Sequence, residues 1–291
     1  MKKKSRMDKK SKIALIAGGS LAAVGGLVYL GLKTPPGSFP PPEDLTRLYD
    51  RVDFSGDFPD PVKYHLTGTF GEKVPVINTA IVWGQARYKI NGLNLPMRFK
   101  THYIPGQHFY RDMEVTWYGR PIIRGYDYYL WGEGRLEANG LMNLYHAGEK
   151  TNQGQVLSMW AEAMWMPSIF ITDDRLRWEE IDDVTARLVF PINGGEESLL
   201  ARFDKQTGIL RYVSGMRYRN EQENRIPWRV DYSGWTARHG VRIPRKMAAS
   251  WADQDSPYAT YIMEGIEYNV DVSEKIPQET VPRTEAGGEA A

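Results

Sequence analysis

The chain has 291 residues, of which 42% are hydrophobic and 12% aromatic, with no cysteine and a net charge of +1. This composition is typical of a folded protein, and the lack of cysteine excludes disulfides, thiolate metal sites and a cysteine nucleophile. Residues 1–33 carry eight basic residues and one acidic residue, whereas the remainder carries 29 basic and 35 acidic residues. Because the remainder is mildly acidic, no nucleic-acid partner is predicted.

The N-terminus has the pattern of a membrane anchor. A basic segment, residues 1–12, precedes twenty uncharged residues from Ile13 to Leu32, which as a helix would span about 30 Å, the thickness of a hydrocarbon core. The run is longer than the apolar region of a cleaved signal, the alternative, and no A-x-A-like site follows it. We therefore predict a transmembrane anchor over 13–33, with residues 1–12 in the cytoplasm and the C-terminal domain in the periplasm or on the cell surface.

A linker is predicted over residues 34–56. The stretch TPPGSFPPP (34–42) has five prolines in nine residues, which is typical of a stiff, extended spacer. The following stretch EDLTRLYDRV (43–52) places Leu45, Leu48 and Tyr49 on one side of a short helix.

Strand and turn patterns dominate residues 57–272, the predicted folded domain. Alternating segments flank Asn91-Gly92 and the stretch 204–208, both of which predict hairpins. One convincing helix is predicted, from Gln155 to Met166, and Pro167 ends it. About a dozen strands without βαβ alternation predict a mainly β fold, with an antiparallel sheet curled into a half-barrel or open barrel around one mid-chain helix. Residues 273–291 are predicted to be a disordered tail.

Glu162 stands between two tryptophans in WAEAMWMP (160–167). A carboxylate at the edge of an apolar helix has three interpretations. It pairs with one of the many arginines, it orients the polar part of a ligand in a sheet-lined cavity, or it acts as a general acid or base. The third requires a partner group and a tuned pKa, for which the sequence offers no sign.

An acidic cluster lies in ITDDRLRWEEIDDV (171–184), and its carboxylates are Asp173, Asp174, Glu179, Glu180, Asp182 and Asp183. Hard cations bind such oxygen ligands. The spacing does not match a calcium-binding loop, and Arg175 and Arg177 are interleaved, so a solvated hairpin edge is favoured over a metal site. Phosphate-binding and nucleophile-elbow motifs are absent, and no cofactor or metal is predicted.

Nine tryptophans suit either a packed core or a curved sheet that encloses an apolar cavity. For the cavity, the candidate ligand-binding residues are Trp160, Glu162, Trp165, Tyr103, Trp117, Asp127 and Tyr129. No catalytic residue is assigned.

An ordered series of motifs carries a family resemblance: PDPVKY (59–64), GYDYY (125–129) with GEG (132–134), the helix motif ending AEAMWMP (161–167), Trp178, Trp228, and GVRIP (240–244). The series resembles an uncharacterised family of bacterial, membrane-anchored extracytoplasmic proteins, a domain of unknown function. The resemblance implies no catalytic residue, but it makes a functional role for Glu162 and Trp165 more expected. More loosely, the architecture is similar to the half-barrel folds of lipoprotein carriers, in which a sheet closes over an acyl-binding cavity.

Three functions follow as hypotheses. The leading one is a membrane-anchored extracytoplasmic domain that binds an apolar or amphipathic ligand, such as a lipid or acyl chain. The alternatives are an envelope hydrolase that uses Glu162 or an acidic metal site, and a cell-surface scaffold that binds a protein or glycan. Whether the protein is an enzyme is left open, with binding favoured.

Overall fold

A computed structural model describes residues 25–48, 50–90, 92–141, 143–192, 194–219 and 222–277. Residues 25–33 are helical, and the remaining part of the predicted anchor, 13–24, lies outside the described residues. Within the described part of the chain, no helix is both long and apolar enough to cross a membrane.

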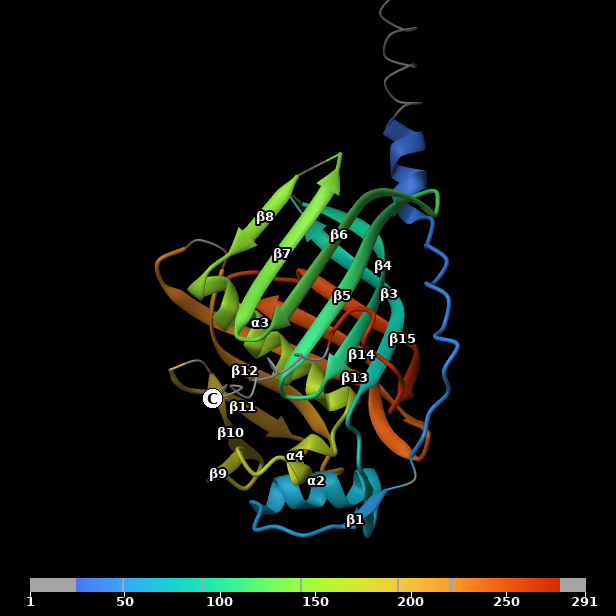
Figure 1. The fold of residues 1–291 in the computed structure, drawn as a ribbon. Helices are drawn as coiled ribbons and strands as arrows, with labels where there is room; N and C mark the ends of the chain where they lie inside the picture. Colours follow the sequence, from blue (N-terminus) through green and yellow to red (C-terminus); the bar gives the residue numbers. More distant parts are fainter. Residues whose placement is uncertain are drawn as a thin grey trace, which may run out of the picture.

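One large antiparallel sheet dominates the described structure (Figure 1). Its thirteen strands follow the order β8-β7-β6-β5-β4-β3-β15-β14-β13-β12-β11-β10-β9, so two meanders join where β3 pairs with β15. The strands are β3 (Ala80–Ile90), β4 (Leu93–Ile104), β5 (His108–Trp117), β6 (Arg120–Leu130), β7 (Glu133–Gly140), β8 (Leu144–Ala147), β9 (Arg177–Asp182), β10 (Thr185–Ile192), β11 (Gly195–Phe203), β12 (Leu210–Tyr218), β13 (Arg225–Arg238), β14 (Val241–Trp251) and β15 (Ala259–Tyr268). Both predicted hairpins are present, as β3–β4 and β11–β12.

The sheet curls around helix α3 (Glu149–Glu162). Strands β7 and β12 stand eight places apart in the sheet, yet both contact α3, which lies inside the curve (Figure 1). Alternate residues of the strands point inward and pack with the apolar residues of α3, which is why the apolar side chains form one main core. The prediction of a curled antiparallel sheet around a mid-chain helix is therefore confirmed.

The mid-chain helix begins earlier and ends differently than predicted. It starts at Glu149 instead of Gln155, and the 3₁₀ turn η1 (Ala163–Trp165) follows it. The first turns are polar, so hydrophobic periodicity could not reveal them. At the buried C-terminal end, Tyr232 Oη donates to the Ala161 carbonyl over 2.9 Å and Tyr268 Oη to the Trp165 carbonyl over 2.7 Å. These hydroxyls satisfy carbonyls that a helix end leaves unpaired.

The helix predicted over 43–52 is wrong, because the described residues of this stretch form no helix and 51–53 form strand β1 (Arg51–Asp53), which pairs with β2 (Lys73–Pro75). Thr46 instead binds the end of β15, where its Oγ1 accepts from the Tyr268 amide over 2.9 Å. The described residues also include the short helices α2 (Asp60–Phe70) and α4 (Ile169–Thr172). Helix α2 buries Val62 and Leu66 against β10, β11 and β14, and so covers one end of the curled sheet.

Both ends of the folded domain lie on the outer face of the sheet. In the proline-rich linker, the Pro36 carbonyl accepts from Gln85 Nε2 over 3.0 Å, and the Arg98 guanidinium lies over the Phe39 ring. Beyond β15, Ile276 is buried in a small outer cluster with Val270, Val272, Ile81 and Leu130. The prediction of a disordered tail is therefore wrong for residues 273–277, because Ile276 packs on this apolar cluster. Residues 278–291 lie outside the described part of the chain.

Candidate functional site

Three neighbouring strands place a row of polar side chains on the inner face of the sheet. Thr101 on β4 pairs directly with Arg111 on β5, and Arg111 pairs with Asp127 on β6. Directly opposed residues on one face lie within side-chain contact. The register alone therefore brings a hydroxyl, a guanidinium and a carboxylate together beneath α3.

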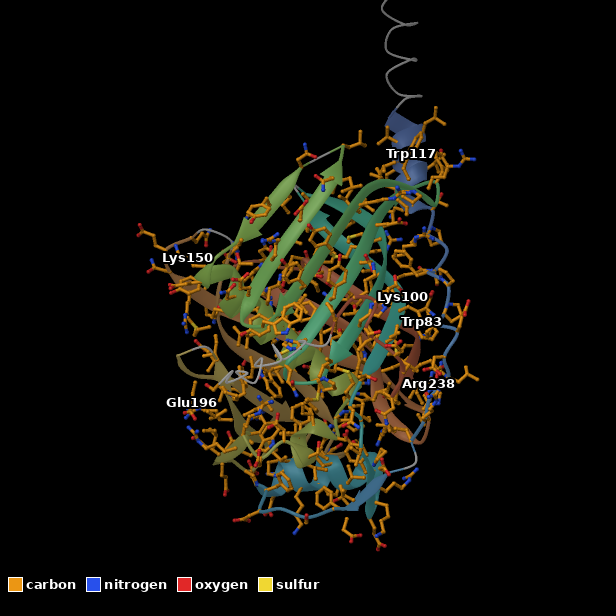
Figure 2. The ribbon with its side chains drawn as sticks, in the orientation of Figure 1. Trp83, Lys100, Trp117, Lys150, Glu196 and Arg238 are labelled. Carbon is orange, nitrogen blue, oxygen red and sulfur yellow. The ribbon has the colours of Figure 1, made fainter. Side chains whose placement is uncertain are left out.

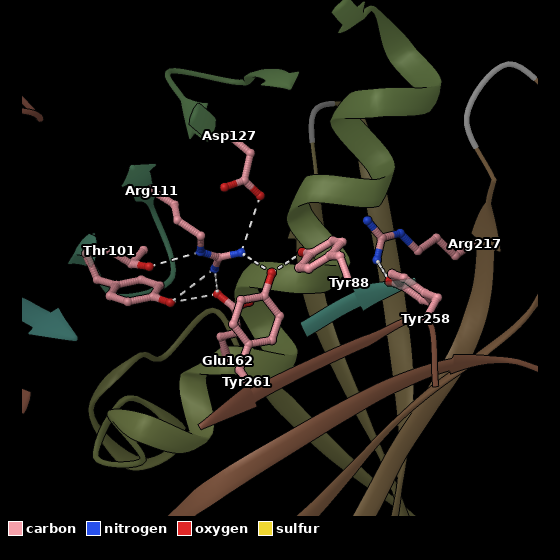
Figure 3. A network of polar contacts seen from close by, with 9 residues as sticks. Tyr88, Thr101, Arg111, Asp127, Glu162, Arg217, Tyr258 and Tyr261 are labelled. Carbon is pink, nitrogen blue, oxygen red and sulfur yellow. Dashed lines mark hydrogen bonds and ion pairs between the residues drawn. The ribbon is translucent and has the colours of Figure 1, made fainter. Parts of the chain in front are cut away.

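Arg111 is the centre of a buried hydrogen-bonded network (Figure 3). Its Nε donates to Thr101 Oγ1 over 2.9 Å, and its Nη1 donates to Tyr261 Oη over 3.0 Å and to Asp127 Oδ2 over 3.3 Å. Its Nη2 forms an ion pair with Glu162 Oε2, which also accepts from Tyr103 Oη over 2.6 Å. Because Arg111 is only 1% exposed, these partners replace the water that its charge would otherwise require.

The network holds one positive group between two carboxyl groups. Burial opposes the charge of Arg111, but the nearby Asp127 and Glu162 outweigh it and raise the pKa of the guanidinium, which stays protonated. For Asp127, burial outweighs the attraction of Arg111 and raises the pKa of the carboxyl to about 6. Its Oδ1 accepts no hydrogen bond from another residue. Asp127 is thus a buried acid that titrates near neutral pH and has hydrogen-bonding capacity to spare.

A cavity of about 440 Å³ lies between this network and α3. One wall carries the polar network through Arg111, Asp127 and Glu162. Much of the remaining wall is apolar, from the side chains of Met113, Leu136, Leu144, Ala161, Val230, Met247 and Ala249. The volume is within the range of about 300–1,000 Å³ that small-molecule sites usually have.

Another part of the same cavity is lined by the Arg217 guanidinium and by aromatic rings. The Arg217 guanidinium lies 4.8 Å from the Trp228 ring centre and 5.8 Å from that of Trp251, and its Nη1 donates to Tyr258 Oη over 3.3 Å. Its buried Nε has no hydrogen-bond partner. A Cβ at Gly154 of α3 would lie 3.1 Å from that Nε. Glycine costs about 1 kcal/mol inside a helix, and here it leaves room for the arginine.

The structure brings three of the seven predicted site residues together. Glu162, Tyr103 and Asp127 meet around Arg111, and Glu162 and Asp127 line the cavity. Glu162 pairs with an arginine, as the first interpretation expected. It is buried, however, and does not lie at a solvated helix edge, because the sheet curls over that side of α3.

The other four candidates lie outside the cavity wall. Trp160 stacks on Phe190, with 5.1 Å between ring centres. Trp165 donates from Nε1 to the Pro244 carbonyl over 2.9 Å. Both indoles are buried in the core, as is Tyr129, while Trp117 is partly exposed at the end of β5. The aromatic residues that do line the cavity are Tyr88, Tyr218, Trp228, Trp251, Tyr258 and Tyr261.

Sequence reasoning missed Arg111, the residue that connects the network. The available signal was alternation: in β5 the inward positions are Phe109, Arg111, Met113 and Val115, so a single charge stands in an apolar series. A buried charge needs partners. A single arginine among the inward apolar residues of a strand is therefore a stronger sign of a site than a tryptophan-rich helix.

The acidic cluster forms surface ion pairs. Asp173 pairs with Arg175, Glu179 with Arg177 and Arg187, Asp182 with Arg202, and Asp183 with Lys205. No group of three or more His, Cys, Asp or Glu side chains that could hold a metal ion occurs in the described residues. The cluster therefore resembles the solvated hairpin edge that its interleaved arginines predict.

A pH dependence of stability follows from Asp127. Its pKa rises from 3.8 to about 6 on folding, so between these values the unfolded chain releases the proton that the folded chain keeps. Stability therefore falls as pH rises through this window, by up to about 3 kcal/mol. An Asp127→Asn variant lacks this titration. We expect denaturant titrations from pH 4 to 7 to show wild type losing stability relative to the variant, and parallel pH profiles would contradict the assignment.

The model of a family of unknown function, DUF6544, matches residues 50–262. The chain belongs to this family. The resemblance to an uncharacterised family is therefore confirmed. A sequence search of curated proteins finds no match.

Several solved structures resemble this DUF6544 protein distantly. A LolA superfamily protein from Nitrosomonas europaea has a TM-score of 0.45 and 8% identity, and the match covers 75% of this chain and 96% of the other. A DUF1329 family protein from Desulfovibrio piger has a TM-score of 0.40 and 14% identity, with coverage of 68% and 89%. An outer membrane lipoprotein-sorting protein domain from Vibrio parahaemolyticus has a TM-score of 0.39 and 10% identity, and the match covers 68% of this chain and 88% of the other. Such scores and identities are too low to transfer a ligand or a function.

Proposed function

We propose that residues 13–33 anchor the protein in a membrane and that its extracytoplasmic domain binds an amphipathic lipid in the cavity beneath α3. The observation that carries this proposal is a single cavity with both kinds of wall: apolar side chains over much of it, and a buried ionic network at one side. An apolar ligand alone would leave the network without a role in binding, and a fully polar ligand would gain nothing from the apolar wall.

The apolar wall suits an acyl chain. Met113, Met247 and Val230 present flexible or branched side chains without hydrogen-bonding groups, and methionine adapts to ligands of irregular shape. Each methylene group that leaves water for such a wall contributes about 0.8 kcal/mol. An acyl chain that moves from a bilayer to this wall therefore stays out of water and keeps the stabilisation that its methylene groups have in the bilayer.

The polar groups indicate what the other end of the ligand carries. Asp127 Oδ1 is an acceptor without a donor, and Arg217 Nε is a donor without an acceptor. Both residues line the cavity. A hydroxyl or amide group, as in the glycerol or amide-linked region of a lipid, carries a donor and an acceptor and so suits a polar wall that offers both kinds of partner.

Photo-cross-linking tests this proposal with the full chain. The protein is reconstituted in lipid nanodiscs that contain a phospholipid with a diazirine in its acyl chain, irradiated, and digested for peptide mass spectrometry. We expect adducts on the cavity wall, in peptides that contain Met247 of β14 or Val230 of β13, in addition to adducts on the anchor. Adducts confined to the anchor would contradict lipid binding in the cavity.

A further inference from the structure

Three hairpin turns lie at the same end of the sheet. Strands β3 to β8 form a meander in which each neighbour is antiparallel. The turns β3–β4, β5–β6 and β7–β8 therefore all fall on one side, and β4–β5 and β6–β7 on the other. Figure 1 shows the β5–β6 and β7–β8 turns at the end where the helix of residues 25–33 lies.

Each of these three turns exposes large apolar side chains. Leu93 at the β3–β4 turn is 56% exposed, and Leu141 at the β7–β8 turn is 79% exposed. Trp117 and Tyr118 at the β5–β6 turn are 38% and 40% exposed. These four residues are called the apolar rim. Single exposed apolar residues need no explanation, but large apolar side chains on three turns at the same end of a sheet are typical of an interaction surface.

The helix of residues 25–33 is attached to this rim. The Tyr118 amide donates to the Gly31 carbonyl over 3.0 Å, and Tyr118 Oη donates to the Leu27 carbonyl over 3.1 Å. The Trp117 indole packs on the backbone of Gly31, where any added Cβ would collide with the ring. Figure 2 shows Trp117 beside this helix, at the end of the molecule away from Glu196.

We propose that the apolar rim lies in the headgroup region of the bilayer that residues 13–33 enter, so that the domain sits on the membrane and is not suspended from a free linker. This inference rests on the anchor of the proposed function. The occupant is lipid because the attached helix continues the uncharged run from Ile13 to Leu32, which brings the bilayer to this end. Tryptophan and tyrosine are also the residues that favour membrane interfaces.

The rim would also place the cavity next to its ligand. Ile90, at the end of β3, and Leu144, at the start of β8, both line the cavity. They directly adjoin the β3–β4 and β7–β8 turns that carry Leu93 and Leu141. A lipid would then pass between bilayer and cavity over an apolar surface, without crossing water.

The absence of cysteine makes the test direct, because a single introduced cysteine can be labelled alone. Leu93→Cys and Leu141→Cys place an NBD fluorophore on the rim, and Ile181→Cys on β9, 46% exposed, is the matched control. The full chain is reconstituted in phospholipid vesicles with and without lipids that carry a doxyl quencher near the headgroup. We expect the two rim labels to emit at shorter wavelength than the same fluorophore in water and to lose most of their fluorescence with the quencher. The label at Ile181→Cys should emit as it does in water and should not be quenched.

Two results would overturn the proposal. Rim labels that emit and quench like the control would mean that the rim faces water. A blue-shifted emission without lipid quenching would mean that a protein, or a second copy of this chain, covers the rim. Flotation tests the anchor separately, because a chain that does not float together with the vesicles is not anchored in them. Failure of the rim is thus distinguished from failure of the proposed function.

Discussion

Replacement of Arg111 by methionine is expected to lower the free energy of unfolding by about 3–5 kcal/mol, the usual cost of removing one partner from a buried ion pair. The variant keeps the apolar stem of the side chain but leaves Glu162 and Asp127 buried without their cation. Thr101 and Tyr261 also lose a hydrogen-bond donor. Denaturant titration followed by tryptophan fluorescence measures the change.

A triple variant separates charge from packing in this network. Arg111→Met combined with Asp127→Asn and Glu162→Gln has no buried charge at the site, and an unpaired buried charge is what makes the loss of one partner so costly. We expect the triple variant to recover most of the lost stability. If Arg111→Met alone costs less than about 1 kcal/mol, the value of an exposed ion pair, or if the triple variant recovers nothing, the network does not hold the fold in the way described.

The second large effect is expected from filling the cavity. Ser158 lies on α3 and lines the cavity, so Ser158→Trp places an indole where the lipid tail would lie. We expect the cavity cross-links of the diazirine lipid to fall by about tenfold or more, a loss of about 1.4 kcal/mol or more in binding. The cavity has room for the ring, so stability should change by less than the roughly 1–3 kcal/mol typical of overpacking.

A matched substitution controls for the added tryptophan. Ser233 of β13 is exposed to solvent, so Ser233→Trp adds the same side chain away from the cavity. Its cross-links should match those of wild type. Equal cross-linking of β13 and β14 in Ser158→Trp and Ser233→Trp would show that the adducts arise outside the cavity.

The architecture was predictable because its signals are local. Turns such as Asn91-Gly92 and the stretch 204–208, with alternation on either side, specify hairpins without reference to the rest of the chain. Helix α2 was missed because its apolar positions, Val62 and Leu66, are few, although Pro61 in its first turn is a residue that helix starts favour. The polar start of α3 was missed for the same reason.

The site was only partly predictable, because the register between neighbouring strands decides which side chains meet in it. Glu162 and Asp127 drew attention as carboxylates among aromatic residues. Their common partner Arg111 could not be identified until β5 was aligned with β4 and β6, which depends on the whole sheet. Trp160 and Trp165 were expected at a ligand and lie in the core, since a helix inside a curled sheet is covered on several sides and a tryptophan there has no need of a ligand.

Lipid binding beneath α3 is tested by native mass spectrometry of the full chain, with wild type, Ser158→Trp and Ser233→Trp each released from the same mild detergent. Lipid held by the anchor is common to all three proteins, whereas lipid held in the cavity depends on Ser158. We expect wild type and Ser233→Trp each to retain one lipid more than Ser158→Trp, and organic extraction to identify that lipid. Equal lipid content in all three proteins would contradict a lipid-binding cavity beneath α3.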